Sequence, residues 1–134
     1  MPIVKIQKII FVSTFIFFAH SVEEYLTNFP NIDWSVLSFA KLLNITPLLT
    51  WLIIQIVLFA FLIFSQLFIL KKSVPWWFAL IFTGIMLIEL SHIYFTITRR
   101  LYYPGFYTSL AFPILGFYFF QTYRNYCKTK IDFH

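Results

Sequence analysis

The stretch PLLTWLIIQIVLFAFLIFSQLFIL, from Pro47 to Leu70, decides the fold class. It contains no charged side chain, and only a few of its residues are polar. A helix that crosses the hydrocarbon core of a bilayer needs about 20 consecutive, mostly apolar residues. We therefore predict a transmembrane helix over residues 47–70, which Lys71 and Lys72 end.

The rest of the chain has the same character. Of its 134 residues, 60% are hydrophobic and 11% are charged, and the mean hydropathy is +0.82. Soluble domains carry about 25% charged residues, so the composition indicates a polytopic membrane protein with a single domain. The apolar runs lack the alternation of barrel strands, so we predict an all-α fold with four transmembrane helices. The predicted spans are residues 6–26, 47–70, 75–97 and 106–123, with a kink at Pro113 in the last.

A short helix is predicted between the first two spans. In NIDWSVLSFAKLLN, residues 31–44, the apolar residues follow helical spacing and the remainder is polar. This pattern is typical of a helix that lies in the membrane interface. Asp33 or Asn31 is expected to cap it, and Trp34 to anchor it at the depth of the headgroups.

Most basic residues fall on one side of the membrane if the chain crosses four times. This arrangement predicts cytoplasmic termini in the plasma membrane of a prokaryote. The net charge of +5 does not indicate nucleic-acid binding, because the basic residues sit at the ends of apolar runs. Arg99 and Arg100 fall on the outer side with Lys41. The residues on the cytoplasmic side are Lys5, Lys8, Lys71, Lys72, Arg124, Lys128 and Lys130.

Five ionisable residues lie within two of the predicted spans. A charge at the bilayer centre costs at least ~2.5–3.5 kcal/mol, so such residues are usually functional. At 1.5 Å per residue, His20 and Glu89 each lie ~21 Å from the cytoplasmic start of their helices. The matching depth predicts one shared site in the outer half of the bilayer. Its residues are His20, Glu23, Glu24, Glu89 and His92.

The spacing of these residues favours a metal site. His20 shares a helix face with the acids three and four positions later, and Glu89 with His92 forms a Glu-x-x-His pair of the kind used in metal-binding bundles. Two histidines with carboxylates suit zinc, iron or manganese. We predict His20, Glu24, Glu89 and His92 as ligands, and Glu23 and Glu24 as catalytic acids or bases. One of the two adjacent acids is expected to turn outward.

The residues after the third span are candidates for substrate binding. Arg99 and Arg100 are either anchors for lipid phosphates, or one of them is a counter-charge to the carboxylates or a clamp for an anionic substrate. We assign Arg99, Arg100 and Tyr103 to substrate binding, and Arg100 also to catalysis.

Two blocks of the sequence carry a family resemblance. His20-Ser21-Val22-Glu23-Glu24 fits the pattern HXXEE, and a later block has His92, Arg100, Tyr103-Pro104-Gly105 and an apolar run with Pro113. From about residue 11 to 123 the chain resembles the HXXEE-motif family of small integral membrane proteins, whose function is uncharacterised. The resemblance implies a compact helical membrane protein but no reaction. A looser architectural likeness exists to the emopamil-binding-protein group of sterol isomerases.

Three functions remain open at this point. The first is a metal-dependent membrane enzyme that acts on a lipid or isoprenoid-like substrate. The second is a metal-free isomerase or cyclase that uses paired carboxylates as acid and base. The third is a proton or ion carrier, or an accessory subunit. The other spans carry almost no ionisable groups, which favours a pocket over a channel. The oligomeric state has no visible signature.

Overall fold

The computed structural model describes residues 2–70 and 74–131, and within them the chain forms helices and no strand. The all-α prediction is therefore confirmed. Lys71 and Lys72, predicted to end the second span, lie outside the described residues. The elements are α1 (Pro2–Leu26), η1 (Phe29–Asn31), α2 (Trp34–Leu43), α3 (Pro47–Leu70), α4 (Trp76–Ile88), α5 (Leu90–Arg99), α6 (Phe106–Ser109) and α7 (Ala111–Ile131).

Three segments are long and apolar enough to cross a membrane. They are Pro2–Leu26, Pro47–Ile69 and the combined α4–α5 segment Trp76–Arg99. The fourth predicted span falls on α6 and α7, which do not meet the same condition. The physical reason is that α6 is short and separate, and that the second half of α7 is the polar sequence QTYRNYCKTK. The described helices thus show three candidate spans where the sequence predicted four.

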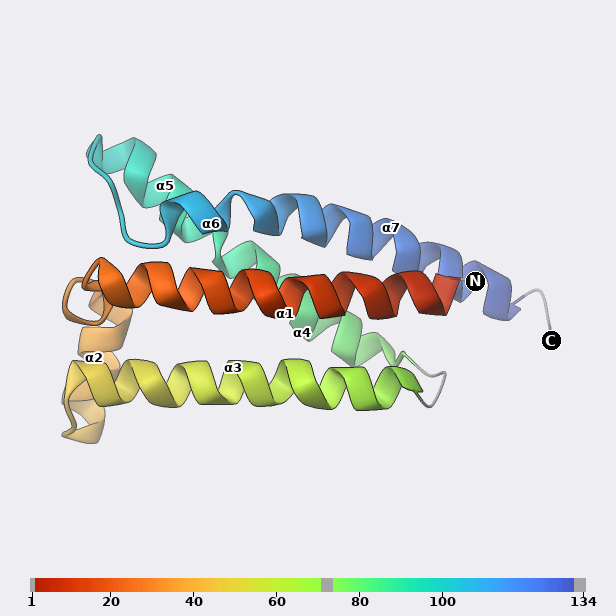
Figure 1. Cartoon of the computed structure of the whole chain (residues 1–134), viewed down its shortest axis with the longest axis horizontal. Helices are drawn as coiled ribbons and strands as arrows, with labels where there is room; N and C mark the ends of the chain where they lie inside the picture. Colours follow the sequence, from red (N-terminus) through yellow and green to blue (C-terminus); the bar gives the residue numbers. More distant parts are fainter. Residues whose placement is uncertain (1, 71–73, 132–134) are drawn as a thin grey trace.

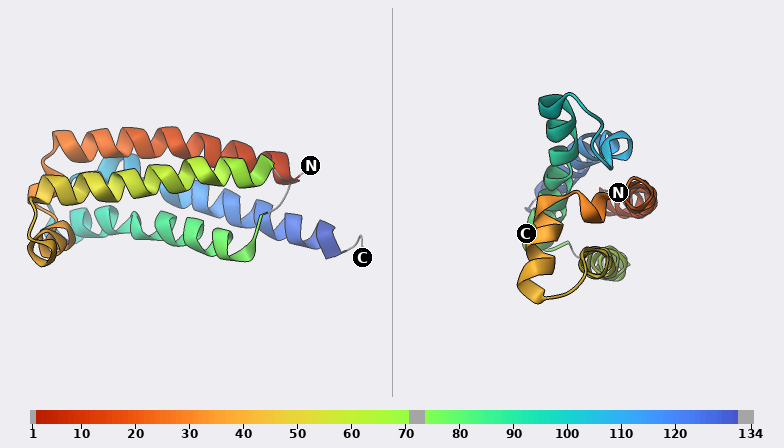
Figure 2. Two further views of the ribbon diagram at one scale, coloured as in Figure 1. Left: turned by 90° about the horizontal axis from the view of Figure 1, so that it is seen from below. Right: turned by 90° about the vertical axis from the view of Figure 1, so that its left-hand side faces the viewer.

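The long helices form a bundle around α1. In Figure 1, α1 lies between α3 and α7, and it packs against both, while α4 packs against α7. Helix α1 begins, and α7 ends, at the same end of the bundle (Figures 1 and 2). The main core is aromatic and aliphatic, and its fully buried members include Phe82, Phe112 and Phe119. This core connects the helices that carry the site residues.

Two of the long segments are interrupted. Leu110 separates α6 from α7, three residues before Pro113. A proline lacks the N–H that would bond to the carbonyl four residues earlier, so Pro113 accounts for this break, as predicted. The break between α4 and α5 falls at Glu89, one of the predicted site residues.

Helix α2 lies across one end of the bundle (Figures 1 and 2). Asp33 is its N-cap, because its Oδ1 accepts hydrogen bonds from the backbone N–H groups of Ser35 (2.9 Å) and Val36 (3.0 Å). The other carboxylate oxygen accepts the hydroxyl of Tyr103 at 2.6 Å. The prediction that Asp33 caps this helix is confirmed, and the same side chain ties α2 to the loop after α5.

Asp33→Ala is expected to lower the free energy of unfolding. Loss of an N-cap costs about 1 kcal/mol, and a buried hydroxyl left without an acceptor costs about 1–3 kcal/mol. We expect a total of about 2–4 kcal/mol, measured by denaturant unfolding in detergent. Asp33→Asn keeps the capping oxygen and should lose less. The exposed Ser38→Ala, on the same helix, should change stability by less than about 0.5 kcal/mol. An Asp33→Ala protein as stable as wild type would contradict the assignment.

Candidate functional site

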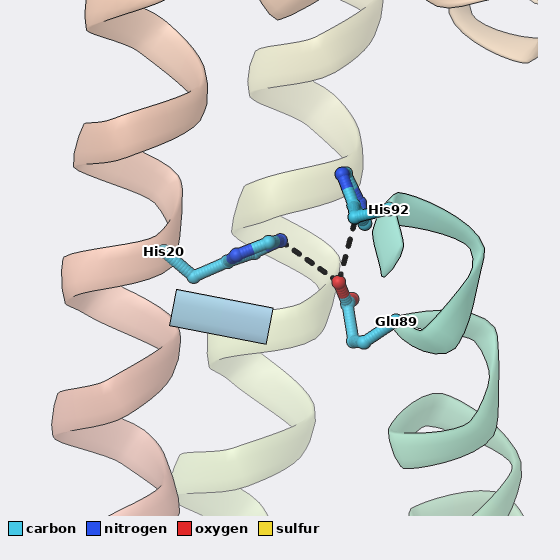
Figure 3. Close-up of side chains that lie close together, drawn as sticks. All are labelled: His20, Glu89 and His92. Atoms are coloured by element: carbon cyan, nitrogen blue, oxygen red, sulfur yellow. Dashed lines mark ion pairs between the residues drawn. The ribbon is translucent and has the colours of Figure 1, made fainter. Parts of the chain in front are cut away.

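Four buried ionisable side chains meet near the end of the bundle where α2 lies. His20 and Glu24 come from α1, Glu89 from the turn between α4 and α5, and His92 from α5. Each is at most 7% exposed. Figure 3 shows the two imidazoles pointing toward the Glu89 carboxylate from separate helices. The structure thus brings together the residues that the sequence placed at equal depth.

The potential ligand atoms of this group lie close enough together to be drawn onto one metal ion. His20 Nε2 lies 2.8 Å and His92 Nε2 lies 3.4 Å from Oε2 of Glu89. Ligand atoms 2.0–2.1 Å from a tetrahedral ion are about 3.3 Å apart. One ligand atom from each of these three residues fits within a group 4.8 Å across. We call His20, Glu89 and His92 the His/Glu centre.

A hydrogen bond to the backbone fixes the tautomer of His92. Its Nδ1 bonds to the carbonyl oxygen of Pro104. A carbonyl only accepts hydrogen bonds, so Nδ1 carries the proton. The Nε2 lone pair then faces Glu89, in the arrangement typical of a metal-binding histidine.

A second chain of hydrogen bonds fixes His20. Its Nδ1 lies 2.7 Å from Oγ1 of Thr108, and that hydroxyl donates to Oε2 of Glu23 at 2.6 Å. Because the hydroxyl has one hydrogen and Glu23 accepts it, Thr108 accepts a hydrogen bond from His20 Nδ1. The Nε2 lone pair of His20 therefore also points into the centre.

Both histidines thus turn an acceptor toward carboxylate oxygens, which are acceptors too. In the part of the chain that the structure describes, His20 Nε2 and Glu89 Oε2 are buried and have no hydrogen-bond donor. Buried polar atoms without a partner are rare in native proteins and require an explanation. A cation at the centre, either a metal ion or a proton, supplies one.

Glu24 faces the centre from one side and is held from the other. Its Oε1 lies 3.5 Å from His20 Nε2 and 3.6 Å from His92 Nε2. Its Oε2 accepts hydrogen bonds from Trp51 Nε1 (2.9 Å) and Gln55 Nε2 (3.0 Å), both on α3. Sequence reasoning missed this role of α3. The available signal was the pair Trp51 and Gln55, which are polar at helical spacing in an otherwise apolar span.

Glu23 turns away from the His/Glu centre. Its carboxylate accepts hydrogen bonds from the N–H groups of Tyr107 (3.1 Å) and Thr108 (2.9 Å) and from the hydroxyl of Tyr102 (2.6 Å). Consecutive residues on a helix point about 100° apart, so Glu23 and Glu24 cannot face one centre. Burial and the bond to Glu23 raise the pKa of Tyr102 to about 12, which keeps this donor protonated. The catalytic role predicted for Glu23 has no support in this placement.

The predicted substrate-binding residues are divided between the surface and the core. Arg99 and Arg100 are exposed, and in residues 2–70 and 74–131 no ion pair joins either to a carboxylate. The Arg99 guanidinium lies over the rings of Phe95 (5.0 Å) and Tyr103 (5.4 Å). Tyr103 is buried with its ring 5.6 Å from that of His92, but its hydroxyl points to Asp33. Burial and this bond raise the pKa of Tyr103.

A glycine allows the loop after α5 to close over the two imidazoles. Gly105 has φ of +85°, a conformation that side chains disfavour. A Cβ at this position would lie 2.6 Å from Cε1 of His20 and 2.8 Å from Nδ1 of His92. The sequence pattern includes Gly105 but indicates no role for it, and it indicates none for Thr108.

Comparison with known proteins identifies the family. A family described as "Protein of unknown function with HXXEE motif" matches residues 11–119. The chain belongs to this HXXEE family. The matched range contains the whole His/Glu centre, and the motif itself supplies His20, Glu23 and Glu24. No curated protein and no solved structure matches the chain.

Proposed function

We propose that this HXXEE protein is an integral membrane enzyme in which the His/Glu centre holds a divalent metal ion. The observation that carries the proposal is the convergence of acceptor atoms. Two imidazoles with protonated Nδ1 atoms direct their Nε2 lone pairs at a carboxylate, and two of these buried atoms lack a donor. Zinc, iron and manganese all accept two nitrogen ligands and one carboxylate.

Three protein ligands leave a coordination position open, which is typical of catalytic metal sites. A metal here would activate water or polarise a carbonyl group. Glu24 is not part of the group that fits within 4.8 Å, and its Oε1 lies close to both imidazoles. We assign it the role of general acid or base beside the ion. The substrate is a lipid or isoprenoid-like molecule, since the centre lies between apolar helices.

The membrane placement belongs to the same proposal. We place α7 as a fourth crossing and α2 in the interface. Support comes from the common end of the bundle at which α1 begins and α7 ends (Figure 1). Three basic residues belong to these parts of the two helices: Lys5, Lys8 and Lys128. Basic residues gather on the cytoplasmic side, so both termini face the cytoplasm, here of a prokaryotic cell.

One observation favours a second candidate. The 2.8 Å separation of His20 Nε2 and Glu89 Oε2 equals that of a charge-assisted hydrogen bond. A proton in place of the metal would make the protein a metal-free acid–base isomerase or cyclase, or a proton carrier. Glu24 would then serve as the partner acid or base.

Metal analysis of the purified protein separates these candidates. Protein expressed with zinc, iron and manganese in the medium, and purified without a histidine tag or chelator, should contain about one ion per chain. His20→Ala and His92→Ala should each retain less than about a tenth of that content, because ligand loss removes most of the binding free energy.

The matched control is His134→Ala, which changes the remaining histidine of the sequence and should leave the metal content unchanged. Wild-type protein without stoichiometric metal would overturn the metal proposal and favour the proton. Full metal content in His92→Ala would do the same.

A further inference from the structure

A cavity of about 230 Å³ lies directly beside the His/Glu centre. Its walls come from α1, α2, α3 and the α4–α5 segment. Glu24 and all three residues of the centre line it. Any molecule that reaches the centre through this cavity meets the Nε2 and carboxylate atoms described above.

Part of the cavity lining is apolar. Leu58 of α3 and Ile88 of α4 line this part, together with Ile54 and Ile85. The wall formed by α1 is deeply buried, whereas Ile88 is 69% exposed. Ile88 therefore marks a side on which the cavity reaches the surface, and its segment, Trp76–Arg99, is long and apolar enough to span a membrane, as is α3. A ligand would enter from the lipid, not from the water.

The charge of the lining selects against anions. Glu24, Asp33 and Glu89 line the cavity, and none of its lining residues in the described chain is Lys or Arg. A divalent cation brings two positive charges against three carboxyl groups, so it gives the lining no net positive charge when those groups are ionised. Arg99 and Arg100, the predicted clamp for an anionic substrate, are not part of the lining. Like charges brought together at a binding site weaken binding strongly.

The volume limits how much of a ligand the cavity holds. At ~30 Å³ for a water-sized group, it accommodates about eight non-hydrogen atoms. Only the polar end of a lipid fits, and the hydrocarbon chain must extend through the opening into the bilayer. The Ser91 hydroxyl also lines the cavity and can bond to a neutral oxygen group, whereas the Ser35 hydroxyl donates to Asp33 and is left only as an acceptor.

We propose that the site takes the uncharged, oxygen-bearing end of a lipid, such as an alcohol or ester, which enters laterally between α3 and α4. Phosphorylated lipids are excluded. This inference rests on the proposed function in that it concerns the same site. The selection by charge and the route of entry do not depend on whether a metal ion is bound.

The test compares two probes that differ only in the phosphate. Radiolabelled monooleoylglycerol and the lysophosphatidic acid with the same oleoyl chain are titrated against the full-length protein in nanodiscs of neutral lipid. Monooleoylglycerol should bind saturably, and the lysophosphatidic acid should bind about 100-fold more weakly because of charge repulsion. Equal or tighter binding of the anionic probe, or no binding of either probe, would overturn the inference.

A pair of variants tests the route. Leu58→Trp fills the apolar part of the cavity and should weaken binding of monooleoylglycerol about tenfold. Ile56→Trp is the matched control on the same helix, since Ile56 is 66% exposed and does not line the cavity. Binding unaffected by Leu58→Trp would place the ligand elsewhere and refute the route.

Metal content is measured on every sample. Selective binding of the neutral probe by protein without metal would sustain this inference while the metal proposal fails. Stoichiometric metal without selective binding would do the reverse.

Discussion

Gly105→Ala is expected to disrupt the His/Glu centre more than an alanine at either of the other two glycines. The new Cβ would lie 2.6 Å from His20 Cε1 and 2.8 Å from His92 Nδ1, closer than carbon and nitrogen atoms can approach. The left-handed backbone conformation adds about 1–2 kcal/mol of strain for a residue with a side chain. To relieve both, the loop must move away from the imidazoles, and His92 then loses its bond to the Pro104 carbonyl.

The measurements are metal content and denaturant unfolding in detergent. Loss of groups that orient metal ligands lowers affinity about 10–100-fold, and we expect Gly105→Ala to reach the upper end because both histidines are affected. Its free energy of unfolding should fall by several kcal/mol, which is exceptional for a single substitution.

Gly84→Ala is the matched control. Gly84 lies inside α4, and a Cβ there would meet nothing within 4 Å. Alanine in a helix interior is favoured over glycine by about 0.5–1 kcal/mol, so this variant should be slightly stabilised and keep its metal. A Gly105→Ala protein with the stability and metal content of wild type would mean that the loop does not close over the histidines.

The helices could be predicted well because their signals are local. The span predicted from Pro47 to Leu70 coincides with α3, and the third span corresponds to α4 and α5. Length and hydropathy depend only on neighbouring residues. The fourth predicted span is not among the three candidate spans, since its apolar run is divided between α6 and α7 and α7 continues into a polar sequence. Neither helix length nor hydropathy shows where such a helix leaves the lipid.

The site could be predicted in part. Counting residues from the ends of the helices placed His20 and Glu89 at one depth, and the structure puts their side chains 2.8 Å apart. Depth says nothing about how a helix is rotated against its neighbours. The choice between Glu23 and Glu24 depends on that rotation, as does the contact of Trp51 with Glu24. Thr108 was missed because it comes from a distant segment that folds back onto α1.

The two adjacent acids of the motif are expected to affect different properties of the protein when each is changed to its amide. In Glu24→Gln, the amide oxygen can take the place of Oε2 and accept from Trp51 and Gln55. The NH₂ group then replaces Oε1, near both imidazoles. The fold should persist, while the loss of a negative charge and of an acceptor beside the ion should weaken metal binding about 10–100-fold.

In Glu23→Gln, no orientation of the amide keeps all the hydrogen bonds of the carboxylate. Each oxygen of Glu23 accepts two donors, Oε1 from Tyr102 and Tyr107 and Oε2 from the N–H and hydroxyl of Thr108. An amide must turn its NH₂ group toward one of these pairs. The NH₂ group should face the exposed pair, Tyr102 and Tyr107, and the lost hydrogen bonds should lower the free energy of unfolding by about 0.5–1.5 kcal/mol, more than Glu24→Gln does.

The contrast between the variants is the informative result, because each is the matched control of the other. Metal content and unfolding free energy, measured on both, should change in opposite order: Glu24→Gln loses more metal affinity and Glu23→Gln more stability. Equal effects on both quantities would mean that the two carboxylates share one role. The reverse order would place Glu23 at the metal and contradict the geometry. The expected order follows from the geometry of α1, because consecutive side chains on a helix point about 100° apart. Glu24 therefore faces the His/Glu centre, while Glu23 faces the loop that it holds in place.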